Sequence, residues 1–171
     1  MPVRLRERDP APFEIRVGIS SVMTVRAAAL DDVDAIFALE TAAFADDRLS
    51  RRAIRRFVAA PHKPMMVARR ADRLAGYALV SLRKGGRTCR IYSLAVDPAY
   101  GRRGVGCELV HACERYARTR RCEALRLEVR WDNAPAIALY RGLGYEEFDR
   151  SPQYYSDGAE ALRFQRKLAP L

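Results

Sequence analysis

Residues 91–106 read IYSLAVDPAYGRRGVG and combine the patterns of a strand, a turn and the start of a helix. The apolar run 91–96 is typical of a buried strand, which Asp97 and Pro98 end. A turn rich in glycine and arginine follows, and a helix is predicted to begin near Gly104. A strand that turns directly into a helix points several unpaired backbone N–H groups and the positive end of the helix dipole at one place. The stretch therefore predicts a binding site for a phosphate-bearing ligand.

Two familiar phosphate-binding motifs do not account for this turn. The GxGxxG fingerprint of dinucleotide-binding folds is absent, and so is the GxxxxGK[ST] loop. Gly104 and Gly106 would allow the backbone to approach a phosphate closely, and Arg102 and Arg103 add positive charge. An ordinary strand-to-helix turn is the structural alternative. If the turn binds a ligand, a pyrophosphate cradle of another kind is expected.

The pattern on either side predicts a mixed sheet rather than the regular alternation of a doubly wound fold. Apolar residues recur at helical spacing after Asp31, with Asp31 or Asp32 as the cap, and residues 83–86 are typical of a hairpin loop. The predicted helices are Asp31–Phe44, Ser50–Ala59, Gly104–Arg120 and Asn133–Leu143, and the predicted strands are Met65–Ala68, Leu74–Leu82, Cys89–Val96, Ala124–Arg130, Tyr145–Asp149 and Ala161–Leu168.

Residues 1–22 are expected to be an N-terminal extension, flexible in part. Three prolines break any helix there, although Phe13–Ile19 could pair as an edge strand. Met23 opens a better domain start, so we expect the folded domain to be 23–171.

The composition is that of a globular protein, with 49% hydrophobic and 30% charged residues in 171. No apolar run approaches the roughly 20 residues of a membrane span, and the N-terminus has no apolar core of a signal peptide, so a cytoplasmic location is expected. The four cysteines lack CxxC spacing, and we expect free, buried thiols and no metal site.

The formal net charge is +10, which leaves the partner open. The charge is spread along the chain without a basic block, and a polyanionic cofactor or an acidic protein partner would explain its sign as well as nucleic acid would. Four arginines at 51, 52, 55 and 56 are either a solvated helix face or a surface that steers an acidic acceptor.

A second informative block, residues 125–140, reads LRLEVRWDNAPAIALY. Within its strand, Glu128 points to the face opposite Leu127. Asn133 is a natural helix N-cap, and Tyr140 lies two helical turns later on the same face, about 10 Å along the axis. Taken alone, such a glutamate is a solvated surface residue and such a tyrosine is a core residue.

Together the two blocks resemble the GNAT superfamily of N-acetyltransferases. The first resembles its acetyl-CoA motif, [Q/R]-x-x-G-x-[G/A] after a strand ending in V-D-P, with Gly101 in place of the leading Gln or Arg. The second, with LEVR, the asparagine, AIxLY and LGY, is similar to the branch that acetylates the N-terminal alanine of a ribosomal protein. The resemblance spans about residues 24–168. It implies an α/β (mixed α+β) domain with a mostly antiparallel sheet of about six to seven strands and about four helices, splayed at the cofactor site.

The resemblance also implies roles for individual residues. Glu128 would be the general base, and Tyr140 the general acid that protonates the leaving thiolate. Tyr154 and Tyr155, followed by DGAEA, match the branch's C-terminal segment loosely, so they either line the acceptor pocket or only pack the sheet. The residues expected to bind acetyl-CoA are Leu94, Ala95, Val96, Arg102, Arg103, Gly104, Val105, Gly106, Cys107 and Asn133.

Three functions are compatible with these patterns. The first is transfer of acetyl from acetyl-CoA to a protein N-terminal amine in a direct ternary complex. A single carboxylate base suits an α-amine better than a lysine, because deprotonation at pH 7 costs on the order of 1 kcal/mol for an α-amine and about 4.6 kcal/mol for lysine. The second is acetylation of a small amine, and the third is a non-catalytic domain that binds acyl-CoA or nucleic acid. We expect a monomer or homodimer without a membrane partner, which meets nucleic acid only through the ribosome.

Overall fold

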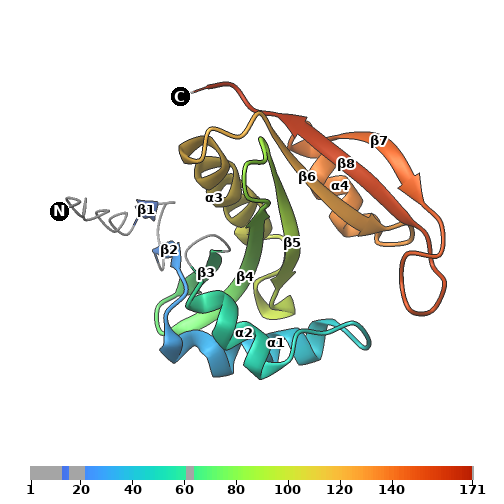
Figure 1. The fold of residues 1–171 in the computed structure, drawn as a ribbon. Coiled ribbons are helices and arrows are strands. Elements are labelled where there is room, and N and C mark those ends of the chain that lie inside the picture. The colour runs from blue at the N-terminus through green and yellow to red at the C-terminus, as the bar shows by residue number, and fades with distance from the viewer. Residues whose placement is uncertain (1–12, 16–21, 61–63, 171) are drawn as a thin grey trace.

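The computed structural model describes residues 13–15, 22–60 and 64–170 (Figure 1). These residues form one sheet of eight strands in the order β1-β2-β3-β4-β5-β6-β8-β7, in which only β5 and β6 run parallel. Seven of the strands lie in the predicted domain, as expected. The strands are β1 Phe13–Ile15, β2 Met23–Ala27, β3 Met65–Arg70, β4 Arg73–Leu82, β5 Thr88–Val96, β6 Ala124–Arg130, β7 Glu146–Ser151 and β8 Ala161–Lys167.

Four α-helices accompany the sheet in the described part of the chain, as predicted. They are α1 Val33–Ala43, α2 Arg51–Val58, α3 Val105–Thr119 and α4 Ala134–Gly142, with 3-10 turns at Leu30–Asp32 and Pro98–Tyr100. The Ser50 hydroxyl accepts a hydrogen bond from the Ala53 amide and so begins α2. The predicted edge strand Phe13–Ile19 is present as β1, which pairs with β2; residues 16–19 lie outside the described ranges.

The predicted cap of α1 is corrected by the structure. Asp32 stands at the N-cap, but its side chain does not cap the helix. The buried carboxylate instead accepts hydrogen bonds from the Arg26 and Arg69 guanidinium groups and from the Ala29 amide. Burial alone would raise the pKa of Asp32, but these hydrogen bonds and charges outweigh it and hold that pKa below its usual value.

Two apolar cores lie on opposite faces of the sheet (Figure 1). One face packs against α3 and α4, with Leu109 of α3 and Phe164 of β8 fully buried. The other face packs against α1 and α2, where Ile36 and Ile54 meet β3 and β4. Among the described residues, no helix is long and apolar enough to cross a membrane.

The sheet opens between β5 and β6. Their pairing begins at Thr88 and Ala124 and ends at Ile91 and Leu127, so the C-terminal parts of the two strands are not paired with each other (Figure 1). On its other side β5 continues to pair with β4 as far as Val96. The expected splay is therefore present, with one unpaired edge of β5 facing the opening.

Candidate active site

A β-bulge lies where the sheet opens. Leu79 of β4 faces Ser93 and Val80 faces Ile91, so Tyr92 is an extra residue in β5. Tyr92 is exposed, and the strand beyond it carries the predicted residues Leu94, Ala95 and Val96. Their backbone groups on the edge away from β4 have no β6 partner, which leaves them available to an extended ligand.

The glycine turn joins this strand to α3. The Asp97 carboxylate accepts a hydrogen bond from the Ala99 amide and shapes the turn, and Gly104 follows as the N-cap of α3 in the left-handed conformation, at φ 78°. No side chain caps this helix in the described structure, so the amides of residues 105–107 have no capping side chain as a partner. Arg102 and Arg103 are exposed beside them.

Gly106 lies close to a neighbouring helix, and its role in close approach to a phosphate stays a prediction. A Cβ atom there would lie 3.0 Å from the Leu139 Cδ2 atom of α4, tighter than ordinary packing allows. Glycine at 106 therefore lets α3 and α4 pack closely, whereas at Gly104 the surroundings are open and the positive φ is what requires glycine. Cys107 is partly buried, and burial raises its thiol pKa.

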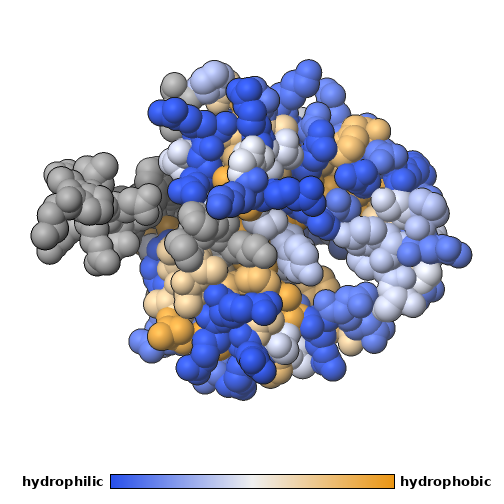
Figure 2. All heavy atoms as spheres, in the orientation of Figure 1, coloured by the Kyte–Doolittle hydropathy of each residue, from blue (hydrophilic) through white to orange (hydrophobic). Residues whose placement is uncertain are grey.

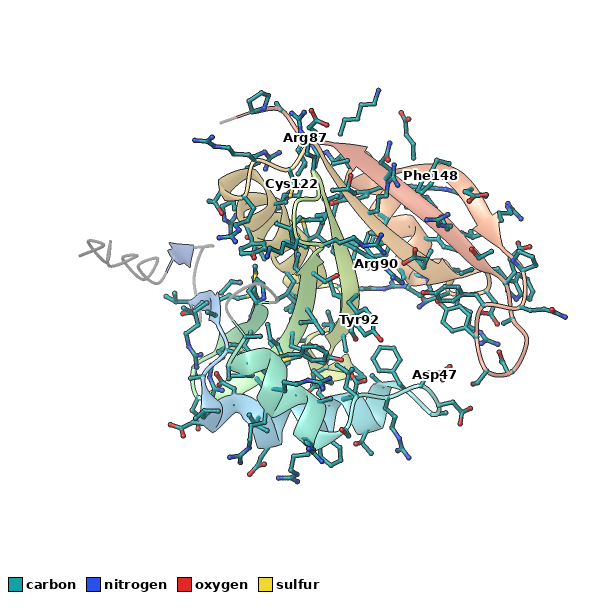
Figure 3. All side chains as sticks on the ribbon, viewed as in Figure 1. Asp47, Arg87, Arg90, Tyr92, Cys122 and Phe148 are labelled. Atoms are coloured by element: carbon teal, nitrogen blue, oxygen red, sulfur yellow. The ribbon has the colours of Figure 1, made fainter. Side chains whose placement is uncertain are left out.

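The predicted base, Glu128, is held by two arginines. Its side chain is only 10% exposed; Arg90 Nε lies 2.7 Å from Oε2, and Arg163 Nε lies 3.6 Å from Oε1. Arg90, which Figure 3 labels, comes from β5 and Arg163 from β8, so the carboxylate is held from both neighbouring strands, one residue beyond the end of the β5–β6 pairing. Sequence reasoning missed both arginines, because only the strand register brings them to Glu128.

The predicted acid, Tyr140, lies in the core on α4. Its ring packs edge-on against Tyr145, with the ring centres 5.8 Å apart, and tilted against Phe164. The structure shows no hydrogen bond to its hydroxyl from the described residues. Burial, then the neighbouring Cys113 and Tyr155, raise the pKa of Tyr140, so the phenol keeps its proton well above neutral pH.

Asn133 begins α4 as predicted. Its side-chain oxygen accepts a hydrogen bond from the Ala136 amide at 3.2 Å, so no described hydrogen bond uses its amide NH2 group as a donor. The exposed position of Asn133 at the end of the β6–α4 turn agrees with the expected contact to a ligand arm.

The β7–β8 loop crosses the opening and carries Tyr154 and Tyr155. The Tyr154 hydroxyl accepts a hydrogen bond from Arg90, and the two tyrosine rings meet edge to face. Burial, Tyr154 and the charge of Glu128 together raise the pKa of Tyr155 to about 12. Because Tyr155 also acts on the pKa of Tyr140, it lies within electrostatic reach of both predicted catalytic groups.

Two further contacts fix that loop. The Ser156 amide donates to the Asp47 carboxylate at 3.2 Å, which ties the loop to the segment between α1 and α2 (Figure 3). Asp157 accepts two hydrogen bonds from Arg130 at the end of β6. The surface is hollowed between these two parts of the molecule (Figure 2). Tyr155 is thus near enough to interact electrostatically with both Glu128 and Tyr140, although no direct contact between the Glu128 and Tyr140 side chains is described.

No group of three His, Cys, Asp or Glu side chains in the described part of the chain could hold a metal ion. The cysteines there are free thiols, three of them buried.

Comparisons with known proteins identify the family of the chain. Residues 30–145 match the acetyltransferase (GNAT) family. The N-alpha-acetyltransferase RimI of Mycobacterium tuberculosis is 36% identical over 71% of this chain and 77% of its own length. A ribosomal protein bS18-alanine N-acetyltransferase of Salmonella typhimurium is 39% identical over 49% of this chain and 55% of its own. A mycothiol acetyltransferase of Clavibacter michiganensis is 36% identical over 72% of this chain and 42% of its own.

The matched segment spans only 38% of another relative, an uncharacterized protein of Mycobacterium leprae that is 38% identical over 80% of this chain. Among solved structures, Ard1 of Thermoplasma volcanium superposes with a TM-score of 0.78 at 26% identity, covering 86% of this chain and 98% of its own. The overall fold is thus shared with a solved structure, and the family model covers more than half of the chain. The chain is a member of the GNAT family of N-acetyltransferases.

Proposed function

We propose that this chain transfers the acetyl group of acetyl-CoA to the N-terminal α-amine of a protein or peptide. The observation that carries the proposal is the end of β5–β6 pairing at Ile91 and Leu127, which opens the sheet beside Glu128. An acetyl donor and an amine acceptor can enter such an opening from its two faces. The relatives named as N-alpha-acetyltransferase and ribosomal-protein alanine N-acetyltransferase support this acceptor class.

The residues present fit acetyl-CoA. The uncapped amides at the start of α3, with Arg102 and Arg103 beside them, suit a pyrophosphate. The free edge of β5 from Leu94 to Val96 suits an amide-containing arm that pairs like a strand. Bound there, acetyl-CoA would supply an activated thioester whose sulfur departs as a thiolate.

Glu128 is positioned to remove the proton from the incoming amine. Its Oε2 atom accepts the Arg90 hydrogen bond, while Oε1 has Arg163 only at 3.6 Å. We therefore assign Oε1 as the atom that takes the proton, directly or through one water molecule. The two arginines fix the carboxylate in place, so its orientation is set before the substrate arrives.

Tyr140 is the proposed proton donor to the leaving group. As the amine nitrogen forms its bond to the acetyl carbon, the carbon–sulfur bond breaks and the phenol donates its proton to the departing sulfur. Burial keeps Tyr140 protonated until that moment, because its pKa is raised. No covalent enzyme intermediate is required, and each catalytic group acts once per turnover.

Release of free thiol from acetyl-CoA tests the proposal. We expect release to require a peptide with a free N-terminus and to stop when that N-terminus is blocked, even if the peptide contains lysine. Thiol release with blocked peptides would contradict an α-amine acceptor. Binding of acetyl-CoA without thiol release by any amine would instead indicate a non-catalytic binding domain.

A second candidate is acetylation of a small-molecule amine, because a relative covering 72% of this chain is named mycothiol acetyltransferase. The relatives named as N-alpha-acetyltransferase and ribosomal-protein alanine N-acetyltransferase favour the first candidate instead. Amino sugars and polyamines offered beside peptides separate the two candidates: faster turnover of a small amine favours the second.

A further inference from the structure

A separate pocket of about 360 Å³ lies on the face of the sheet that carries α1 and α2. It is formed where the β4–β5 hairpin approaches α2. Its walls combine apolar and aromatic side chains with two guanidinium groups. The lining residues are Phe57, Leu79, Ser81, Leu82, Arg83, Arg90 and Tyr92.

The pocket is positively charged and contains no acid among its lining residues. The Arg83 side chain is exposed and forms no ion pair with a described carboxylate. Arg90 uses Nε for Glu128 and Nη2 for Tyr154, which leaves Nη1 without a hydrogen bond in the described structure. Two arginine donors in one pocket therefore remain available to an anionic group.

This pocket adjoins the catalytic opening. Arg90 belongs to both, since it lines the pocket and binds Glu128 (Figure 3). Tyr92, the bulge residue, also lines the pocket at the point where β5 separates from β6. An acceptor whose amine reaches Glu128 can therefore place a nearby side chain in the pocket.

The sheet face around the pocket also carries positively charged side chains. Arg126 of β6, opposite Arg90 in the register, hydrogen-bonds Gln165 and packs against Phe148 rather than an acid. The carboxylates of that face are already engaged by arginines, as Glu128 and Asp149 show. Arg83 and Arg126 therefore remain without a described acid partner, so an incoming anion meets their positive charge and a lysine-bearing acceptor is repelled by it.

We propose that this pocket is an acceptor subsite for a carboxylate, so that the chain prefers peptides with Asp or Glu within the first three residues. This inference rests on the proposed peptide acceptor. Arg83 is the specificity-determining residue, because its guanidinium has no other described charge partner. The aromatic wall formed by Phe57 and Tyr92 packs against the methylene groups of the acidic side chain.

Peptides that differ at one position test the subsite. Each peptide has a free N-terminus and carries Glu, Gln or Lys at residue one, two or three. Since a hydrogen bond to a charged group at a partly exposed site is modest, we expect the Glu peptide to exceed the Gln peptide by about tenfold in kcat/KM at its best position, mainly through KM. The Lys peptide should rank last, and added salt should narrow the differences.

Arg83→Glu should remove the Glu preference and raise the Lys peptide above the Glu peptide. Lys84→Glu is the matched control, because it makes the same change in charge on the next residue of the hairpin but does not line the pocket. The control should keep the ranking of the unchanged chain. A ranking that Arg83→Glu leaves intact, or that Lys84→Glu also inverts, would overturn the inference.

The outcomes also separate this inference from the function on which it rests. Equal kcat/KM for Glu and Gln peptides at all three positions would overturn the subsite and leave peptide acetylation standing. Absence of turnover with every free peptide would overturn both.

Discussion

Replacing Glu128 with Gln removes the proposed base while keeping the side chain's size. The change leaves an oxygen that can still accept one hydrogen bond from Arg90 or Arg163. Loss of a positioned general base typically lowers the rate by about 10²–10⁴-fold, which corresponds to about 3–5 kcal/mol in the barrier. We expect the loss to appear in kcat with little change in the affinity for acetyl-CoA, because Glu128 lies away from the α3 turn.

The structural consequence of the same change must be measured separately. The Arg90 and Arg163 side chains are 38% and 31% exposed. Water can therefore solvate their guanidinium groups in part once the negative charge of Glu128 is gone. The destabilisation should therefore be about 1–2 kcal/mol, or roughly 2–8 °C in Tm for a domain of this size. That is small against a typical stability of about 5–15 kcal/mol, so the variant should remain folded at assay temperature.

A continuous thiol-release assay and a thermal melt on the same sample separate the two effects. Glu123→Gln is the matched control, because it makes the same chemical change to an exposed residue whose carboxylate pairs with Arg87. The control should retain activity within about twofold. A folded Glu128→Gln variant that retains activity within about threefold would refute the assignment of Glu128 as the base.

Three other changes have expected outcomes. Tyr140→Phe keeps the ring packing but removes the proton donor, so kcat should fall about 10²-fold or more while Tm and acetyl-CoA affinity hold; a kcat that does not change removes Tyr140 from the mechanism. Gly104→Ala places a side chain at φ 78°, which should cost about 1–2 kcal/mol and weaken acetyl-CoA binding in a calorimetric titration, whereas unaltered binding would argue against the turn as its site. Asp32→Asn leaves Arg26 and Arg69 without their shared carboxylate, and Tm at pH 7 should drop by roughly 6–12 °C. Because the pKa of Asp32 is lowered on folding, its stabilisation is present above about pH 4 and is lost as the pH falls further, so melts should show a smaller loss between pH 5 and pH 3 for Asp32→Asn than for the unchanged chain.

Local signals in the sequence located the elements that build the site. Asn133, with Pro135 two residues later, predicts the start of α4, and the structure places the cap there. Gly144, at φ 81°, follows its end. The run 91–96 followed by Asp97 and Pro98 likewise predicts the strand and turn before α3. These signals are readable because each depends on residues a few positions apart.

The long-range contacts could not be predicted in this way. Arg90 meets Glu128 across 38 positions, and only the parallel β5–β6 register brings them together. The contact between Asp47 and Ser156 spans 109 positions and joins two loops. No short pattern encodes such a pairing. The bulge at Tyr92 is similarly hidden, because the sequence does not show that one residue of β5 lacks a partner in β4.

Gly106 shows how a correct motif can carry an incomplete explanation. The motif predicts that Gly106 lets a phosphate approach the backbone closely. A Cβ atom at this position would also make a tight contact with Leu139 of α4. The same residue type serves packing between two helices. A sequence pattern identifies that a position requires glycine, but the neighbour that imposes the requirement is visible only in three dimensions.

The most direct test of the account is to identify the nitrogen that receives the acetyl group. A peptide with a free N-terminus and an internal lysine is incubated with the chain and acetyl-CoA, and tandem mass spectrometry locates the modification. We expect a single acetyl group on the N-terminal nitrogen, an unmodified lysine, and no product from a peptide whose N-terminus is blocked. Acetylation of the lysine alone, or of the blocked peptide, would contradict it.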